Sequence, residues 1–293
     1  MIEWYLLALI SAFFSAVAAI FEKKVLFKEK ALGFSTLFAL FNLILAIPFF
    51  FFINFTLVTS SGLFVLMSKS LFEAGAFLCV MQGIKNLEIS EALPLLVLTP
   101  GLVALGAFIF LAETLTFLQI TGIFLLMIGT YTLQIKTKEK QKLLDPIKAF
   151  FKTKAYYYII AALILFTTTS ILDKAILKNF KLPLNAFMGF QHLFLAIIFI
   201  IFIISTKKTH QLKSAIKFSW ILILTISIFT IVYRYTQLSA VKIAPVALVL
   251  SLKRISVFFA VLIGGKLFQE HNLLIRTLAT AIMIAGAVLV IVF

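Results

Sequence analysis

The feature that most constrains the fold of this chain is a succession of apolar runs, each close to the length of a membrane-spanning helix. A bilayer core requires about 20 consecutive apolar residues in a helix, whereas the strands of a membrane barrel alternate over about ten residues. The sequence therefore predicts an all-α integral membrane protein with ten transmembrane helices. The expected helices cover residues 4–21, 33–53, 63–84, 89–111, 117–135, 156–173, 185–205, 217–238, 243–265 and 273–292.

The composition agrees with a membrane location. Of the 293 residues, 63% are hydrophobic and 13% are charged, whereas soluble domains are about 45–50% apolar and about 25% charged. The net charge of +15 would suggest nucleic-acid binding in a soluble protein. Here most lysines lie between apolar runs, where topology control and anionic lipid headgroups account for them. We expect a multi-pass protein of a prokaryotic plasma (inner) membrane, in contact with the lipid bilayer and with no nucleic-acid partner.

The two halves of the chain carry similar motifs at corresponding places. The first run ends in FEKKVL (21–26) and the sixth in LDKAIL (172–177), so in both an acid is followed by a lysine where the apolar run stops. The other aligned pairs are Glu113 with Glu270, which each precede the following run, and Gly129 with Gly286.

These matches predict two repeats of five helices each. The first repeat covers residues 1–135 and the second 156–293, with a basic connecting loop over 136–155. Because five spans bring the chain to the opposite side of the membrane, the second repeat must enter from the other side. The sequence therefore predicts a 5+5 inverted repeat, which is typical of secondary transporters with a midplane site between the halves.

This arrangement, with an acid between spans four and five that recurs between spans nine and ten, resembles the EamA branch of the drug/metabolite transporter superfamily. The resemblance covers nearly the whole chain. It implies alternating-access transport of small metabolites, which in this superfamily include amino acids, nucleotide sugars, sugar phosphates and drugs. We therefore expect a secondary transporter (exporter, importer or exchanger) of a small organic metabolite, anionic or zwitterionic, driven by a proton gradient or by exchange.

An alternative is a membrane enzyme or a lipid-handling protein that acts on phosphorylated lipid headgroups. The chain has no H-E-x-x-H, no G-x-S-x-G, no Walker A sequence and no cluster of Cys and His ligands, which are the patterns that carry such chemistry. We therefore expect no enzymatic activity, no cofactor and no metal. A homodimer is an open alternative.

The lysines give an orientation that differs from the one the resemblance implies. At the ends of the predicted spans and between them, 17 lysines fall on the side that contains residues 22–32, 136–155 and 206–216, and four fall on the other side. The positive-inside rule places that side in the cytoplasm, with both termini outside. The EamA resemblance implies both termini in the cytoplasm. We favour the orientation from the lysine count, with both termini outside, and leave the orientation with cytoplasmic termini as the alternative.

The ninth predicted span contains two adjacent cations, Lys253 and Arg254. They lie about 15 Å from either end of the run, at about 1.5 Å per residue, where each charge costs about 2.5–3.5 kcal/mol on insertion scales. One interpretation is an ion pair that locks this helix to a neighbour. We favour a site for the substrate's anionic group, since guanidinium and ammonium both bind carboxylate and phosphate. A similar Lys-Arg dipeptide grips phosphate in the phosphate translocators of the same superfamily.

The third predicted span contains Lys69 and Glu73, which share one helical face because they are four residues apart. We favour a local ion pair between them. In the alternative, Glu73 pairs with Lys253 or Arg254 when substrate is absent and takes up a proton or releases them when substrate arrives.

Three further side chains are candidates for the site. Arg234 lies about one turn before the expected end of span eight, where it could snorkel to the interface. His192 is more often a hydrogen-bonded helix contact than a ligand, and Tyr235 is more often part of an interfacial aromatic belt than a stacking partner for substrate. The polar groups that could line a cavity are Gln82, Thr99, Gln191 and Gln237.

The remaining charged residues and the prolines have structural interpretations. Glu22–Lys23 and Asp173–Lys174 are expected at helix ends, on the rim of the membrane. Glu113 and Glu270 are expected to cap the helix that follows each of them. Pro94, Pro100 and Pro245 predict kinked fourth and ninth helices.

Overall fold

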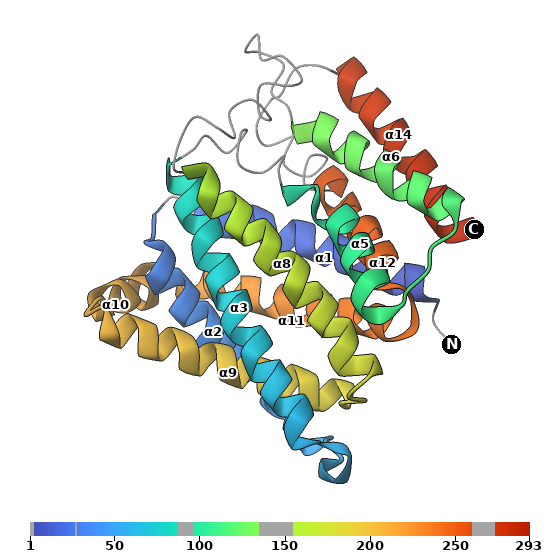
Figure 1. Ribbon diagram of the computed structural model, residues 1–293. Helices are drawn as coiled ribbons and strands as arrows, with labels where there is room; N and C mark the ends of the chain where they lie inside the picture. The colour runs from blue at the N-terminus through green and yellow to red at the C-terminus, as the bar shows by residue number, and fades with distance from the viewer. Residues whose placement is uncertain (1–2, 27, 87–95, 135–154, 260–272) are drawn as a thin grey trace. The chain divides into compact units, whose positions relative to one another are not determined.

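The computed structural model of the protein describes residues 3–26, 28–86, 96–134, 155–259 and 273–293, and its regular elements in those ranges are all helical (Figure 1). The chain divides into two compact units, which are unit 1 (Met1–Ala74 with Leu172–Ile243) and unit 2 (Gly75–Ile171 with Ala244–Phe293). Each unit therefore combines segments from both halves of the sequence.

Unit 1 contains most of the long helices. Its elements are α1 (Trp4–Leu26), α2 (Ala31–Phe51), a 3-10 turn (Phe55–Leu57), the first part of α3 (Ser60–Asn86), the last part of α8 (Ala155–Lys178), α9 (Leu184–Ser205), α10 (Thr209–Phe218) and α11 (Trp220–Ile243). Helix α1 packs along α11, and α2 packs along α9 and α11. Aromatic side chains fill these contacts. The ring of Phe229 lies 5.8 Å from that of Phe14 and 6.3 Å from that of Phe21.

Unit 2 is built mainly around one close helix pair. Its elements are the second part of α3, α5 (Thr99–Leu111), α6 (Phe117–Gln134), the first part of α8, α12 (Val246–Lys253) and α14 (Leu273–Val292). Helices α6 and α14 lie side by side (Figure 1), and α12 packs against α5 and α6.

Small residues allow the close approach of α6 and α14. A methyl group built on Gly122 would lie 2.7 Å from the carbonyl oxygen of Gly286, and one on Gly129 would lie 2.8 Å from that of Ala279. Gly129 aligns with Gly286, and the same alignment places Gly122 opposite Ala279. The two contacts are thus equivalent under an exchange of the two halves of the chain, as expected for a pair of helices from duplicated repeats.

Six helices are long and apolar enough to cross a membrane, as judged by length and composition among the described residues. They are α1, α2, the Ser60–Val80 part of α3, the Tyr157–Lys178 part of α8, α9 and α11. Three shorter apolar helices lie at Thr99–Leu111, Phe117–Thr132 and Leu278–Val292. Many large apolar side chains are exposed, among them Phe51 and Phe117 at 81% each. Such a surface fits lipid better than water.

Several helices extend beyond the predicted spans. Helix α1 continues to Leu26, α8 to Lys178 and α11 to Ile243, five residues past the predicted end in each case. Hydropathy marks the end of an apolar run. A helix can continue past that point through charged residues until a helix-breaking residue such as proline ends it. Helix α11 ends at Ile243 because the next residue, Ala244, precedes Pro245. Helical geometry is disfavoured at a residue that precedes a proline.

The ninth predicted span is not one continuous helix. Helix α12 ends at Lys253 and Arg254 adopts a turn, after which residues 255–259 are helical again. In the fourth predicted span, a turn at residues 97–98 precedes α5. The interruption in the fourth predicted span therefore lies next to Pro100. The chain is also interrupted next to Pro245, between α11 and α12, whereas the turn at Arg254 has no proline beside it. Pro94 and Glu270 lie outside the described residues.

Candidate functional site

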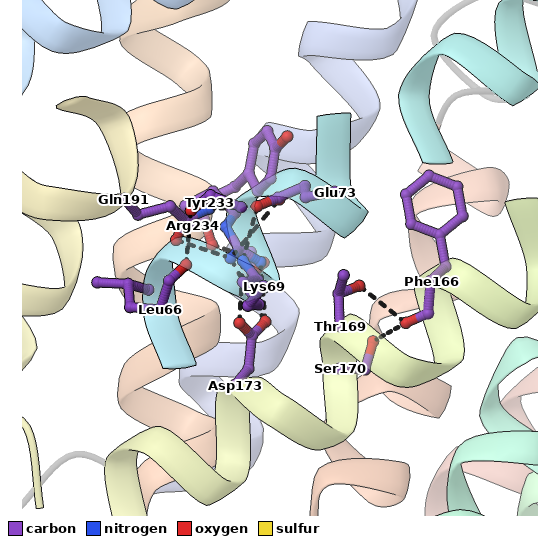
Figure 2. Close-up of polar contacts among 12 residues, drawn as sticks. Leu66, Lys69, Glu73, Phe166, Thr169, Ser170, Asp173, Gln191, Tyr233 and Arg234 are labelled. Atoms are coloured by element: carbon purple, nitrogen blue, oxygen red, sulfur yellow. Dashed lines mark hydrogen bonds and ion pairs between the residues drawn. The ribbon is translucent and has the colours of Figure 1, made fainter. Parts of the chain in front are cut away.

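Four charged side chains meet inside unit 1, from three different helices (Figure 2). Lys69 and Glu73 come from α3, Asp173 from α8 and Arg234 from α11. We refer to these four residues as the charge network. Two cations and two anions balance, so the charge network is neutral overall.

Lys69 connects the two carboxylates. Its Nζ atom lies 2.7 Å from Oε2 of Glu73 and 3.0 Å from Oδ1 of Asp173. The predicted local pair of Lys69 and Glu73 is therefore present. The Nζ atom also lies 5.5 Å from the centre of the Phe187 ring, where the negative face of the ring favours a cation.

Arg234 contacts both acids from the opposite helix. Its Nη2 atom lies 3.4 Å from Oδ2 of Asp173 and 3.9 Å from Oε1 of Glu73. Gln191 of α9 bridges Glu73 and Arg234. Its Nε2 donates to Oε2 of Glu73 at 2.8 Å, and its Oε1 accepts from Nη2 of Arg234 at 3.1 Å. An amide suits this position because it offers both a donor and an acceptor.

Burial gives these contacts their strength. The side chains of Lys69 and Asp173 are 1% and 5% exposed, and that of Arg234 is 11% exposed. Moving isolated charges out of water costs several kcal/mol each, so such residues occur in an apolar interior only when they are paired. Glu73 is the most accessible member of the charge network, with 24% of its side chain exposed.

Two polar atoms beside these pairs have no hydrogen-bond partner among the described residues. They are Nε2 of His192 and Nε of Arg234. His192 is 3% exposed and lies within electrostatic reach of Arg234, Glu73 and Lys69. The interpretation of His192 as a hydrogen-bonded helix contact does not hold for Nε2. A buried polar atom without a partner is uncommon and calls for an explanation, which a ligand would provide.

The structure corrects the predicted positions of Arg234 and Asp173. Arg234 lies nine residues before the end of α11, about 13 Å along the helix axis, and is buried rather than placed for snorkelling. Asp173 is 3% exposed and is not on a rim. Because the predicted span stopped at Asp173, this residue was not among the predicted site residues. Its neighbour Lys174 is also buried and donates to the carbonyl of Val241 at 2.6 Å.

Arg254, in unit 2, binds a backbone carbonyl. Its Nη2 donates to the carbonyl oxygen of Leu96 at 2.8 Å, and the hydroxyl of Thr99 donates to the same oxygen at 2.6 Å. That carbonyl would normally accept from the N–H of residue 100, which is a proline and has none. Arg254 therefore braces a helix interruption, as in the helix-locking interpretation, although its described partner is a carbonyl rather than an acid.

Glu113 also braces a helix of unit 2. Its Oε2 accepts the N–H of Val246 at 3.0 Å, at the first residue of α12. The carboxylate thus satisfies one of the free N–H groups of a helix start and meets the positive end of its dipole. The sequence predicted such a cap for the helix after Glu113, whereas the structure shows it on α12.

The remaining predicted residues have varied surroundings. The ring of Tyr235 is 38% exposed and stacks on Phe49 at 5.7 Å, which fits an aromatic belt. Gln237 is buried, and the side chain of Gln82 lies outside the described part of α3. The described ion pairs of Glu73 lie within unit 1, whereas Lys253, a partner proposed for Glu73 from the sequence, belongs to unit 2.

Comparison with known proteins identifies the class to which this chain belongs. The model of the EamA-like transporter family matches residues 2–134 and, a second time, residues 153–292. The chain belongs to the EamA-like transporter family. It is therefore an integral, multi-pass membrane protein with two repeats of the EamA unit, and its general function is membrane transport.

The fold of this chain is also found in a solved structure. A crystal structure matches 99% of this chain and 97% of its own chain at 15% identity, with a TM-score of 0.75. At this identity the match shows a common fold and no common substrate. A search of curated proteins found no match.

Proposed function

We propose that this EamA-like protein is a secondary transporter of small zwitterionic metabolites and that the charge network binds them. Transport proceeds by alternating access across ten transmembrane helices that form a 5+5 inverted repeat. The neutrality of the buried charge network is the observation that carries the choice of substrate.

The argument from neutrality is electrostatic. An anion that joins the two cations and two anions of the charge network leaves one negative charge uncompensated, and a cation leaves one positive charge. Either excess carries a large desolvation cost in an apolar interior. A zwitterion adds one charge of each sign, so every group in the enlarged cluster keeps an opposite partner.

The geometry of the charge network indicates where a zwitterion would bind. The contact between Arg234 and Oε1 of Glu73, at 3.9 Å, is the longest ion pair described here. A ligand ammonium at Oε1 of Glu73 and a ligand carboxylate at the guanidinium of Arg234 would replace this weak contact with two close ion pairs. Nε2 of His192 is a further polar atom with which the ligand could form a hydrogen bond.

The positions of the acids along their helices suit alternating access. The two units divide within α3, after Ala74, and within α8, after Ile171. Glu73 and Asp173 each lie within two residues of these divisions. We infer that changes transmitted along α3 and α8 alter the pairing of the charge network, which would couple ligand binding to conformational change. A proton gradient or exchange would supply the driving force.

Saturable flux in proteoliposomes tests this proposal. Purified protein is reconstituted and assayed with labelled amino acids, dicarboxylates, sugar phosphates and organic cations, with and without an imposed pH gradient. Zwitterions should show saturable uptake. Glu73→Gln should lower that uptake about 10–100-fold, the size expected for one lost charged contact of about 1.5–3 kcal/mol. Stimulation by the pH gradient would indicate proton coupling, and stimulation by internal substrate would indicate exchange.

The controls separate loss of binding from loss of fold. Lys178→Gln removes an exposed charge at the end of α8 and should leave uptake unchanged. Each variant must elute as the wild type does in gel filtration. Transport of anions alone, lost in Lys253→Gln/Arg254→Gln and retained in Glu73→Gln, would overturn the proposal and place the site in unit 2.

A further inference from the structure

Helix α10 is a short helix between two membrane-spanning helices of unit 1. It covers Thr209–Phe218 and connects α9 to α11. With ten residues it is about 15 Å long, half the thickness of the hydrocarbon core, so it cannot cross the bilayer. Its residues separate into a side that packs against the protein and a charged, exposed side.

The inner side of α10 is held firmly. The helix packs against α2 (Figure 1), and Gly33 of α2 comes so close to the carbonyl of Gln211 that a side chain would clash. The carboxylate of Glu29 accepts hydrogen bonds from the hydroxyls of Ser214 at 3.0 Å and Ser219 at 2.8 Å. Glu29 is 8% exposed, so this acid pins the α1–α2 connection to α10 and adds little negative charge to the surface.

The outer side of α10 carries basic residues next to apolar groups. His210, Lys213 and Lys217 are exposed and spaced three and four residues apart, so they share one face. Ile216 is 49% exposed and Phe218 is 70% exposed. The Nζ atom of Lys217 lies 5.1 Å above the ring of Phe218. A helix with lysines beside exposed apolar side chains is typical of the membrane interface.

The chain around α10 adds positive charge and almost no negative charge. Glu29 is the sole acid in residues 28–30 and 206–219, and it is buried. The exposed lysines in these two segments are Lys28, Lys30, Lys207, Lys208, Lys213 and Lys217. We refer to these six lysines as the basic patch. Its exposed charge is of one sign, which fits a surface of the opposite sign.

We propose that α10 is an interfacial helix that binds the headgroups of anionic phospholipids through the basic patch. Ile216 and Phe218 would enter the boundary between headgroups and acyl chains, while the lysines extend to the phosphates above them. Each lysine near an anionic surface contributes about 1 kcal/mol, or about fivefold in affinity. This interaction is independent of the substrate bound by the charge network.

Fluorescence of Trp220 can test this proposal. Trp220 lies two residues after the end of α10 and is 47% exposed, and Trp4 is the other tryptophan of the chain. In the full-length Trp4→Phe protein, the emission of Trp220 is recorded in phosphatidylcholine vesicles with a small fraction of brominated lipid. Brominated phosphatidylglycerol should quench Trp220 more strongly than the same fraction of brominated phosphatidylcholine.

A pair of matched double variants assigns the effect to α10. Lys213→Gln/Lys217→Gln should reduce the preference for phosphatidylglycerol by about fivefold or more. Lys178→Gln/Lys181→Gln removes two exposed lysines from the α8–α9 connection and should leave it unchanged. Equal quenching by the two lipids, or a preference that persists in Lys213→Gln/Lys217→Gln, would overturn the proposal. All five residues changed here are exposed or intermediate in burial, and the emission maximum of Trp220 checks the fold of each variant.

Discussion

Charged side chains within the helix packing are used differently in the two units. In unit 1, Lys69, Glu73, Asp173 and Arg234 pair with one another. In unit 2, Arg254 and Glu113 bind backbone groups beside Pro100 and Pro245. Side chains that pair with side chains can exchange a partner for a ligand, whereas a carbonyl or N–H left free by a helix interruption needs its partner in every conformation. The difference supports our proposal that the charge network binds the ligand, while Arg254 and Glu113 brace helices.

The adjacent residues Asp173 and Lys174 show both uses within one turn of α8. Asp173 belongs to the charge network, while Lys174 binds the carbonyl of Val241 near the end of α11. Four predictions test the distinction between the two uses, in order of decreasing effect.

The largest effect is expected from Lys69→Met. The substitution leaves Glu73 and Asp173 with one cation between them, in an environment where an unpaired charge is costly. We expect a loss of about 3–5 kcal/mol in the free energy of unfolding, measured by titration with a denaturing detergent. Lys69→Met/Glu73→Gln, which restores neutrality, should recover part of that loss. A double variant as unstable as the sum of the single variants would show that the charges are not coupled.

Arg254→Met should have the next largest effect. It leaves the carbonyl of Leu96 with one hydrogen bond, from Thr99, and should cost about 1.5–3 kcal/mol, as for other hydrogen bonds to charged groups. In a Pro100→Ala background the residue at 100 regains an N–H that can bind the same carbonyl, so the cost of Arg254→Met should fall. If the two substitutions are additive, Arg254 does not act by replacing the N–H that Pro100 lacks.

Gly286→Ala tests whether backbone contacts also govern the packing of unit 2. The added methyl group would lie 2.7 Å from the carbonyl oxygen of Gly122, and such overpacking should cost about 2 kcal/mol. Gly75→Ala is the matched control, because its methyl group would meet the side chain of Leu165 at an ordinary 3.6 Å. It should be neutral or stabilise by about 0.4–1 kcal/mol. Equal thermal stability of the two variants would contradict a tight contact between α6 and α14.

The smallest effect is expected from Glu113→Ala, which removes the cap of α12. We expect a loss of about 1 kcal/mol, typical of a helix cap. Glu113→Gln retains an oxygen acceptor and should lose about half as much, through the weaker interaction with the helix dipole. A loss as large as that of Lys69→Met would place Glu113 in an ion-pair cluster and weaken the contrast between the units.

The apolar runs by themselves determined the helical class and the approximate place of each apolar helix, whereas the short, charged helix α10 lies between two predicted runs. Every predicted range overlaps a described helix, because a chain in a bilayer has to satisfy its backbone hydrogen bonds internally. The i, i+4 spacing likewise predicted the pair of Lys69 and Glu73, since contacts within one helix depend on helix geometry alone.

Only the tertiary structure decided which charges meet. The sequence placed Asp173 and Arg234 near span ends, because hydropathy does not register that α8 and α11 continue past them. Whether a charge faces lipid, water or another charge depends on which helices pack together, and residues 69, 173 and 234 are far apart in the chain. For the same reason Arg254, which the sequence assigned to an anion, binds the carbonyl that Pro100 leaves free.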